Sequence, residues 1–448
     1  MDLPDFAPTD RPTPDQQRDA LRKGLGRARL WADAGRLDDG PLLEACLHDL
    51  RHDTQIDDGR ADWLWGLIEV AGAVDRLRAP ILAALTELAV ERDAPQLCSL
   101  AAHYAKAGDG RFRDRLSEIV ATRPYPESYL LGEGQLVWLD GAAGFLFIAR
   151  LRGEQLATRA WDDDEWHDRS SVWHAGEELG EEVVARLLAE ATDPPLVRFA
   201  QAHQAAEEER EREWADRPRR QDWSVVELLQ AATSGNLGYR LRAWGEHAAE
   251  ADLRVVAERL READDPREIR NLLYVFAGRP MPDFDPALLE LCRHDDAELR
   301  RRAFMACGQV THEAVRTLGL AELARGIELA GAIDLMVRNF EPGDEARIVA
   351  ALQMPDDADE QHSLLMSVRN LLEANPDADA SVLGLIFYAF TPCEHCRRTA
   401  VRLLLDRAAA PDWLVAECRH DNDERIRELV AADPPAAGGT DDSGAASK

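Results

Sequence analysis

The sequence predicts an all-α protein built of stacked helix pairs, and three observations support this fold class. Apolar residues recur at steps of three and four along most of the chain, as in ILAALTELAVERD, where Ile81, Leu85 and Leu88 share one broad face. Short breaks that contain Asp, Pro or Gly divide these segments into helices of about 10 to 18 residues. In the last third of the chain, the starts of helix pairs recur at a nearly constant spacing.

That spacing identifies the architecture. First helices are expected to begin near Asp285, Pro342, Asp377 and Pro411, and second helices at Asp296, Asp357, Thr391 and Asn422. After Pro342 the successive starts are 35 and 34 residues apart, and the longer gap before it leaves room for an extra helix pair at 312–340. Helix pairs at a period of about 30 to 45 residues are typical of an α-solenoid.

The ends of the chain and one internal charge run suggest how it is organised. Residues 1–14 are rich in Pro and Asp, and residues 434–448 form a tail of small residues that cannot bury a core, so both are expected to be disordered. The run EEEREREWADRPRR ends before Gln221 and reads as a solvated helix leading to a hinge. We therefore expect an N-terminal helical half at 15–220 and a C-terminal repeat half at 221–433.

One stretch is ambiguous between helix and strand. Residues 134–161, GQLVWLDGAAGFLFIARLRGEQLATRAW, are apolar enough for a buried helix or for a small β-hairpin turning at LDGAAGF. Because both neighbouring regions are helical, we favour a helix.

A Cys-x-His-Asp motif occurs three times, in CRHDDAELR (292–300), CRHDNDERIR (418–427) and CLHD (46–49). On a helix, Cys292 and His294 point about 200° apart, so the two side chains cannot share one metal ion. Each cysteine instead belongs on the core face, and the polar residues after it suit a helix end and the next N-cap. We interpret the motif as part of the helical repeat.

The residues after this motif carry a family resemblance. The second helix of two repeats begins with Asp-x-x-Leu-Arg at Asp296 and Asp-x-x-Ile-Arg at Asp423. This pattern resembles HEAT repeats, specifically the short bacterial type also found in phycobilin lyases, over residues 280–431 and more weakly over 40–120. The resemblance implies that the Asp caps the second helix, the aliphatic residue packs inward and the Arg braces the neighbouring repeat. It implies a fold and not an activity.

Charge restricts the classes of partner. Lys and Arg total 53 against 84 Asp and Glu, a net charge of −31. That excess argues against nucleic acid and anionic membranes, whose binding depends on basic side chains, and it suits a basic protein partner. No apolar run approaches the roughly 20 residues of a membrane span, and the chain opens with a polar, proline-rich stretch, so a cytoplasmic location is expected.

The segment WDDDEWHDRSSVW (161–173) is the leading candidate for partner binding. Trp161, Trp166 and Trp173 alternate with acids that include Asp163 and Asp164. Tryptophan supplies anchoring area and acids steer a basic partner. The alternatives are a solvated loop whose tryptophans fold back onto the core, and a loop whose carboxylates attract a divalent cation.

A second candidate is the thiol of Cys393 in the pair Cys393-x-x-Cys396. No second C-x-x-C accompanies the pair and no βαβ setting surrounds it, so we expect neither a metal nor a cofactor. The residues 391–394, TPCE, read as a capping box that begins at Thr391. We interpret the pair as part of a capped structural helix. The alternative is a reactive thiol, because Cys393 would lie at a helix N-terminus beside the two arginines that follow Cys396, which would lower its pKa.

These observations favour a non-catalytic scaffold or protein-binding module that presents an acidic concave surface, with no catalytic residue predicted. The alternative is an enzyme on a HEAT-like fold, of the lyase or nucleobase-processing type. A deep pocket lined by convergent polar side chains would favour the enzyme, and a continuous groove would favour the scaffold.

Overall fold

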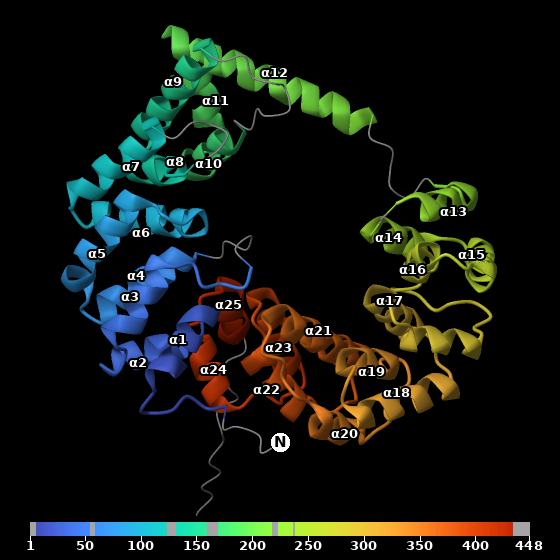
Figure 1. Ribbon diagram of the computed structural model, residues 1–448. Coiled ribbons are helices and arrows are strands. Elements are labelled where there is room, and N and C mark those ends of the chain that lie inside the picture. Colours follow the sequence, from blue (N-terminus) through green and yellow to red (C-terminus); the bar gives the residue numbers. More distant parts are fainter. Residues whose placement is uncertain are drawn as a thin grey trace, which may run out of the picture.

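The computed structural model describes residues 6–53, 59–122, 131–158, 169–216, 223–235 and 238–432. Within these ranges the protein is all-α and contains no strand, which confirms the predicted fold class (Figure 1). None of the described helices is long and apolar enough to cross a membrane.

The helices follow one another along the chain with short connections. In order they are α1 (Pro14–Lys23), α2 (Arg27–Asp33), α3 (Asp39–Leu47), α4 (Arg60–Val70), α5 (Val74–Glu87), the 3₁₀ turn η1 (Glu91–Asp93), α6 (Ala94–Lys106), α7 (Gly110–Thr122), α8 (Glu133–Asp140), α9 (Ala142–Thr158), α10 (Arg169–Leu179), α11 (Glu181–Ala189), α12 (Pro194–Asp216), α13 (Val225–Ser234), α14 (Tyr239–His247), α15 (Glu250–Glu262), α16 (Pro266–Val275), the 3₁₀ helix η3 (Pro286–Arg293), α17 (Ala297–Gly308), α18 (Glu313–Arg325), α19 (Leu329–Met336), α20 (Asp344–Ala351), α21 (Ala358–Ala374), α22 (Ala380–Phe390), α23 (Glu394–Asp406), α24 (Asp412–Cys418) and α25 (Glu424–Ala432).

The repeat starts in the C-terminal third lie where the sequence pattern predicts them. Asp285 and Asp296 cap η3 and α17, and Asp357 caps α21, each with its carboxylate accepting a backbone N–H of the first turn. Helices α20, α22 and α24 begin within three residues of their predicted starts. The extra pair in 312–340 is α18 and α19.

The ambiguous stretch at 134–161 is helical over its described residues. It forms the end of α8 and the whole of α9, separated by Gly141, whose φ of 60° lies in the region that favours glycine. At Gly144 a side chain would place its Cβ 2.3 Å from the carbonyl oxygen of Leu136, so only glycine allows the two helices this close. The glycines that resembled a hairpin turn therefore join two tightly packed helices.

The order of packing differs from the order of the chain. The first helices, α1, α2 and α4, lie against the last helices, α22 to α25, and we call this contact the junction (Figure 1). Asn422 donates its backbone N–H to the carbonyl of Gly24 at 2.9 Å, and Lys23 Nζ donates to the carbonyl of Ala389 at 2.8 Å. The stack thus continues from α25 into α1.

Close backbone approach at the junction depends on one glycine. A Cβ on Gly26 would lie 1.9 Å from the carbonyl oxygen of Glu417, a distance that no real side chain could occupy. The two sides of the junction are therefore closely complementary in shape, because any larger residue at position 26 would push α2 away from α24.

The hydrophobic core runs through the junction. One cluster of buried side chains includes residues of α1 to α12 together with residues of α18 to α25, and a second cluster covers α13 to α19. The described part of the segment expected to be disordered, residues 6–13, also contributes, because Phe6 lies edge-on to Phe390 at 6.2 Å and Thr9 accepts a hydrogen bond from Trp31.

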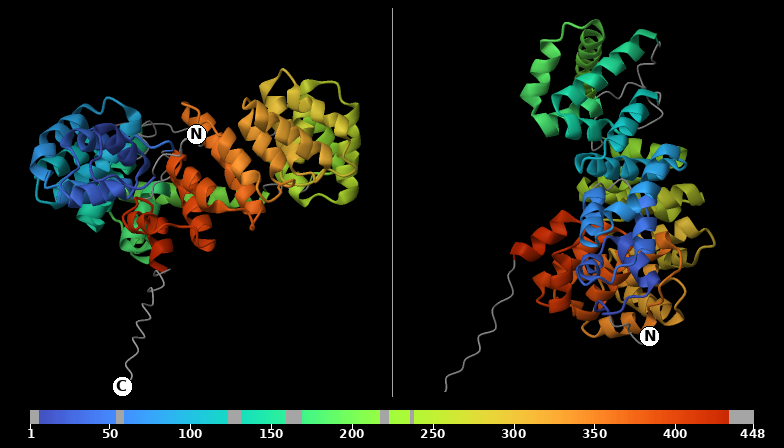
Figure 2. Two further views of the ribbon diagram at one scale, coloured as in Figure 1. Left: turned by 90° about the horizontal axis from the view of Figure 1, so that it is seen from below. Right: turned by 90° about the vertical axis from the view of Figure 1, so that its left-hand side faces the viewer.

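The result is a horseshoe whose open ends come from the middle of the chain (Figures 1 and 2). Helix α13 begins the continuous stack and α12 ends it. The predicted division before Gln221 lies outside the described residues.

Candidate functional site

Four of the five residues in the predicted tryptophan-rich site, Trp161, Asp163, Asp164 and Trp166, lie outside the described residues. The fifth, Trp173 in α10, is 54% exposed and stands beside His174, with ring centroids 4.8 Å apart. Trp173 has the exposure that partner binding requires, and its role stays a prediction.

The repeated Cys-x-His-Asp motif behaves as predicted. Cys292 and Cys418 are 2% and 0% exposed and belong to the apolar clusters. His294 ends η3 and its Nδ1 accepts the backbone N–H of Asp296 at 3.0 Å. The motif forms the turn between paired helices.

Cys393 lies at the N-terminus of α23, but not in the predicted capping box. Cys393 itself is the N-cap, and Thr391 ends α22 and accepts the backbone N–H of Cys393 through its hydroxyl at 3.4 Å. The prediction of a Thr391 cap was wrong because the hydroxyl of Thr391 is used in the turn, by the N–H of Cys393, and α23 begins only at Glu394. Cys393 is only 6% exposed.

The thiol of Cys393 is acidic for a reason that differs from the predicted one. A hydrogen bond from Cys396, aided by another from His362, holds the pKa of Cys393 well below its usual range despite burial. The two arginines after Cys396 have carboxylate partners of their own, since Arg397 pairs with Asp421 at 2.8 Å and Arg398 with Asp423 at 2.8 Å. The pKa of Cys393 is lowered, as predicted, but by hydrogen bonds from Cys396 and His362 and not by the two arginines.

His362 is the site residue that sequence reasoning missed. It lies on α21, 31 residues before Cys393, and its Nε2 is 3.2 Å from Cys396 Sγ. Residues separated by about one repeat period lie side by side in adjacent repeats. This spacing is the one signal in the sequence that could have linked His362 to Cys393.

Buried charges hold the junction. Arg397 and Asp421 are both fully buried, and Arg27 of α2 pairs with the fully buried Glu417 of α24 at 2.8 Å. Glu417 also accepts the hydroxyl of Tyr388 at 3.0 Å. Burial raises the pKa of both Asp421 and Glu417, although their arginine partners oppose the change. Such pairs are costly to bury and very costly to separate, so they make the junction specific.

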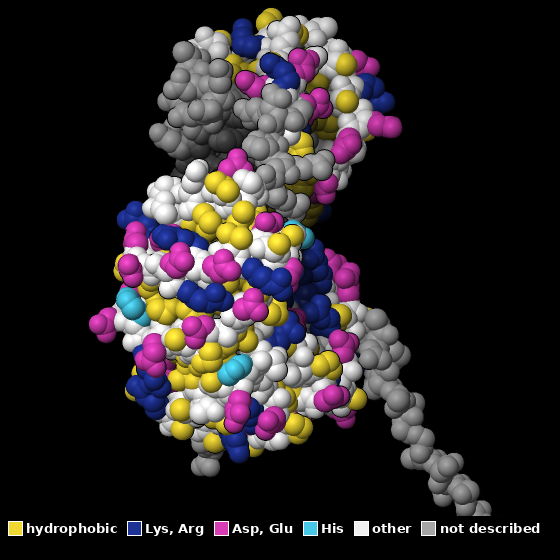
Figure 3. Space-filling model, turned by 90° about the vertical axis from the view of Figure 1, so that its right-hand side faces the viewer, with side chains coloured by type: hydrophobic (Ala, Val, Ile, Leu, Met, Phe, Trp, Pro, Cys, Tyr) yellow, Lys and Arg dark blue, Asp and Glu magenta, His cyan; other side chains and the backbone are white. Residues whose placement is uncertain are grey.

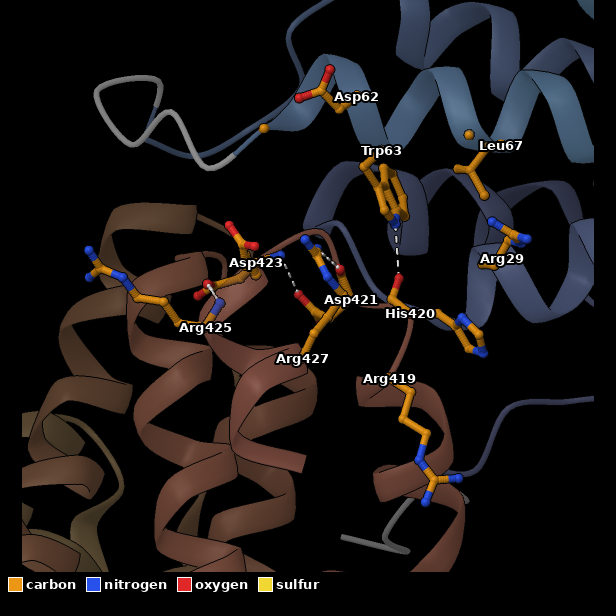
Figure 4. A pocket seen from close by; sticks show the side chains of 13 residues that line it. Arg29, Asp62, Trp63, Leu67, Arg419, His420, Asp421, Asp423, Arg425 and Arg427 are labelled. Carbon is orange, nitrogen blue, oxygen red and sulfur yellow. Dashed lines mark hydrogen bonds between the residues drawn. The ribbon is translucent and has the colours of Figure 1, made fainter. Parts of the chain in front are cut away.

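A polar cavity of about 700 Å³ opens beside the junction, between the start of α4 and the start of α25 (Figure 4). Trp63 Nε1 donates across it to the carbonyl of His420 at 3.0 Å. Arg427 donates to the carbonyl of Asp421, and the side chains of Arg419 and Arg425 extend away from Trp63 (Figure 4). The polar groups of the cavity bond to the protein or point outward, and they do not converge on one position.

Helix α12 presents a different kind of surface. Its first turns pack on α9, where Phe199 is fully buried and Arg198 donates to the carbonyl of Gly153. Beyond Phe199, none of the α12 side chains that the structure describes is buried, and Trp214 is 73% exposed. The remaining 17 residues would extend about 25 Å at 1.5 Å per residue.

Searches of protein-family models, of curated proteins and of solved structures find no match to this chain, so its similarity to known proteins adds nothing to what the fold and these sites support.

Proposed function

We propose that the protein is a non-catalytic scaffold of HEAT-like helical repeats that binds a basic protein partner at the open ends of its horseshoe. The observation that carries this proposal is the exposed second half of α12, which holds Trp214 among acidic side chains. An exposed tryptophan provides the area of a binding hot spot, and surrounding acids steer a basic partner toward it.

The distribution of charge supports placing the partner there. Helices α10 to α12, residues 169–216, contain 12 acidic and five basic residues. Residues 225–308, at the start of the stack, contain 15 acidic and 12 basic residues. On the face that lies to the right in Figure 1, acidic and basic side chains are interspersed (Figure 3). Of these two ends of the stack, the α12 end therefore carries the larger excess of negative charge.

The opposite open end adds apolar area. Val226 of α13 is 59% exposed and Tyr239 at the start of α14 is 63% exposed. Together with Trp214 they give the two ends of the stack exposed large apolar side chains, which a partner spanning the opening would cover.

The cavity beside the junction does not favour the enzyme alternative. A catalytic pocket needs polar side chains that converge on a substrate position. Here Asp62 bonds to His103 at 2.7 Å, Asp423 to Arg398 at 2.8 Å, and Arg427 to backbone carbonyls. These polar side chains of the cavity are thus engaged by neighbouring groups of the protein.

The experiment uses defined probes. The immobilised protein is exposed to two synthetic amphipathic peptides of equal length, one with Lys and Leu and one with Glu and Leu, in a surface plasmon resonance assay. We expect binding of the Lys peptide alone. The association rate should fall several-fold when salt is raised, because the screening length drops from about 10 Å at 0.1 M to about 3 Å at 1 M.

Two variants locate the surface. Trp214→Ala should raise the dissociation rate about tenfold, and Ile327→Ala, at a residue that is 70% exposed between α18 and α19, should leave it unchanged. Equal binding of both peptides, equal effects of the two variants, or tight binding of duplex DNA at physiological salt would contradict the proposal.

A further inference from the structure

Three side chains that commonly bind metal ions meet where α21 approaches the N-terminus of α23. They are His362, Cys393 and Cys396, and their ligand atoms all lie within 4.8 Å of one another. His362 Nε2 is 3.2 Å from Cys396 Sγ. The two sulfurs and the imidazole also share hydrogen bonds, in which Cys393 contacts both of the others.

These separations suit a small tetrahedral ion. With bonds of about 2.3 Å to sulfur and about 2.0 Å to nitrogen, ligand atoms on a zinc ion are about 3.3 to 3.8 Å apart. The three side chains would need to shift by about 1 Å or less to reach that arrangement. Rotamer adjustments of this size leave α21 and α23 in place.

Cysteine thiolates and neutral imidazole nitrogen are among the ligands that zinc prefers, and the cluster supplies both kinds.

His52, which lies outside the group of three, is the nearest candidate for a fourth ligand that the ring contacts indicate. The ring centroid of His52, in the segment after α3, lies 5.3 Å from that of His362, at an interplanar angle of 69°. Two imidazoles on one tetrahedral ion have centroids about 5 Å apart. Asp359 Oδ1 lies 3.6 Å from His52 Nε2, which leaves Nδ1 of His52 for a metal and supplies the carboxylate that usually orients such a histidine.

We propose that His362, Cys393 and Cys396 bind a zinc ion, that His52 completes a tetrahedral site with two sulfur and two nitrogen ligands, and that the ion fastens the segment after α3 to α21 and α23. Two sulfurs and two nitrogens in a tetrahedron are typical of zinc. The proposal depends on this cluster alone and is independent of the proposed function. It replaces the expectation of no metal, which considered only ligands close to the Cys-x-x-Cys pair in sequence.

The first experiment uses the full-length protein, reduced and freed of metal with a chelator. Titration with Co²⁺ should give one saturable equivalent, with the visible bands of tetrahedral cobalt and a thiolate-to-cobalt charge-transfer band. Added Zn²⁺ should abolish both and raise the thermal midpoint of unfolding. A wild-type protein that gives no thiolate–cobalt spectrum overturns the proposal, whatever the behaviour of its variants.

Variants assign the ligands. Cys396→Ser and His362→Gln should abolish stoichiometric Co²⁺ binding, and His52→Gln should weaken it about 10- to 100-fold and alter the visible bands. Cys46→Ala removes a buried thiol elsewhere and should bind Co²⁺ as the wild type does. Circular dichroism reports whether each variant folds. A Cys396→Ser protein that still binds one equivalent with a two-thiolate spectrum would exclude the assignment.

The competing chemistry is a redox dithiol. If Cys393 and Cys396 form a disulfide in the metal-free protein under a glutathione buffer, and the reduced protein binds no Co²⁺, the pair is redox-active and the zinc proposal is wrong. Mass spectrometry after alkylation measures the disulfide directly.

Discussion

The junction and the open ends of the horseshoe differ in how far their side chains are buried and in how closely their helices pack. At the junction, Arg27 pairs with the completely buried Glu417, and Gly26 lets the backbones of the first and last helices approach closely. At the open ends, α12 has no described buried side chain after Phe199, and Trp214 is exposed. The comparison teaches that the ends of a stack need not be the ends of a chain. Here the middle of the sequence supplies the terminal helices, which in repeat proteins carry the polar outer faces.

The largest expected effect is at the junction. Arg27→Ala leaves the fully buried Glu417 without its cation, and we expect a loss of about 3 to 5 kcal/mol in the free energy of unfolding. Arg301→Ala, which removes an exposed pair with Glu298, should cost less than about 1 kcal/mol. Denaturant unfolding followed by circular dichroism measures both. Equal costs would mean that the junction is no more tightly built than the outer surface.

Asp334, a half-buried carboxyl outside the junction, gives a second test of what burial of an acidic group costs. Burial raises the pKa of Asp334, in α19, to about 6, with a hydrogen bond from Ser367 opposing the change. A carboxyl whose pKa is raised on folding contributes most below its unfolded pKa of about 4, and that contribution is lost as the pH rises through 6. Asp334→Asn should therefore stabilise the protein by about 2 kcal/mol at pH 7.5 and have no such effect at pH 4.

The control for this pH profile is Asp296, whose pKa is shifted in the opposite direction. The backbone N–H of Leu299 lowers the pKa of Asp296, so its contribution is present above about pH 4 and lost only in acid. Asp296→Asn should give no gain at pH 7.5. Unfolding midpoints of the two variants at several pH values test the difference, and parallel profiles would refute it.

A capping residue at the open end should have a smaller, local effect. Ser224 accepts the backbone N–H of Glu227 and forms a reciprocal capping box at the start of α13. Ser224→Ala should cost about 1 kcal/mol, and the loss should appear as faster hydrogen exchange within α13 and not as a shift of the global midpoint. Asp357→Ala, at the start of α21 in the interior of the stack, should shift the global midpoint.

The smallest effect is expected from reordering the chain. A circular permutant that begins at Trp223 and ends at Asp216, with the original ends joined by a flexible linker, follows the order of the stack. Its unfolding free energy should lie within about 1 kcal/mol of the wild type. A permutant opened after Gly24, inside the junction, should not fold. Similar stability of the two permutants would show that the junction has no special role.

Local features of the fold could be predicted from the sequence. Apolar periodicity and capping aspartates such as Asp296 and Asp357 depend on neighbouring residues, so the helices and repeat starts are where the pattern places them. The core positions of Cys292 and Cys418 follow from the same helical geometry. The exception is Thr391, where the match to a capping box was outweighed by the turn between α22 and α23.

Long-range features could not be predicted. Periodicity shows which face of a helix is apolar and not which repeat it will meet, so nothing marked α1 and α2 as partners of α24 and α25. The neighbours of Cys393 were missed for the same reason, since His362 lies one repeat away and His52 more than 300 residues away. The tryptophan-rich segment before Trp173 stays a prediction.

The two sides of the junction are synthesised at very different times. Arg27 and Glu417 are 390 residues apart. At about 5 to 20 residues per second, α1 and α2 leave the ribosome tens of seconds before the helices that cover them are made. During that interval two nascent chains can exchange partners, each donating its first helices to the last helices of the other. We expect rapid refolding at high protein concentration to give such exchanged dimers, which size-exclusion chromatography would detect, and dilute refolding to give monomers alone.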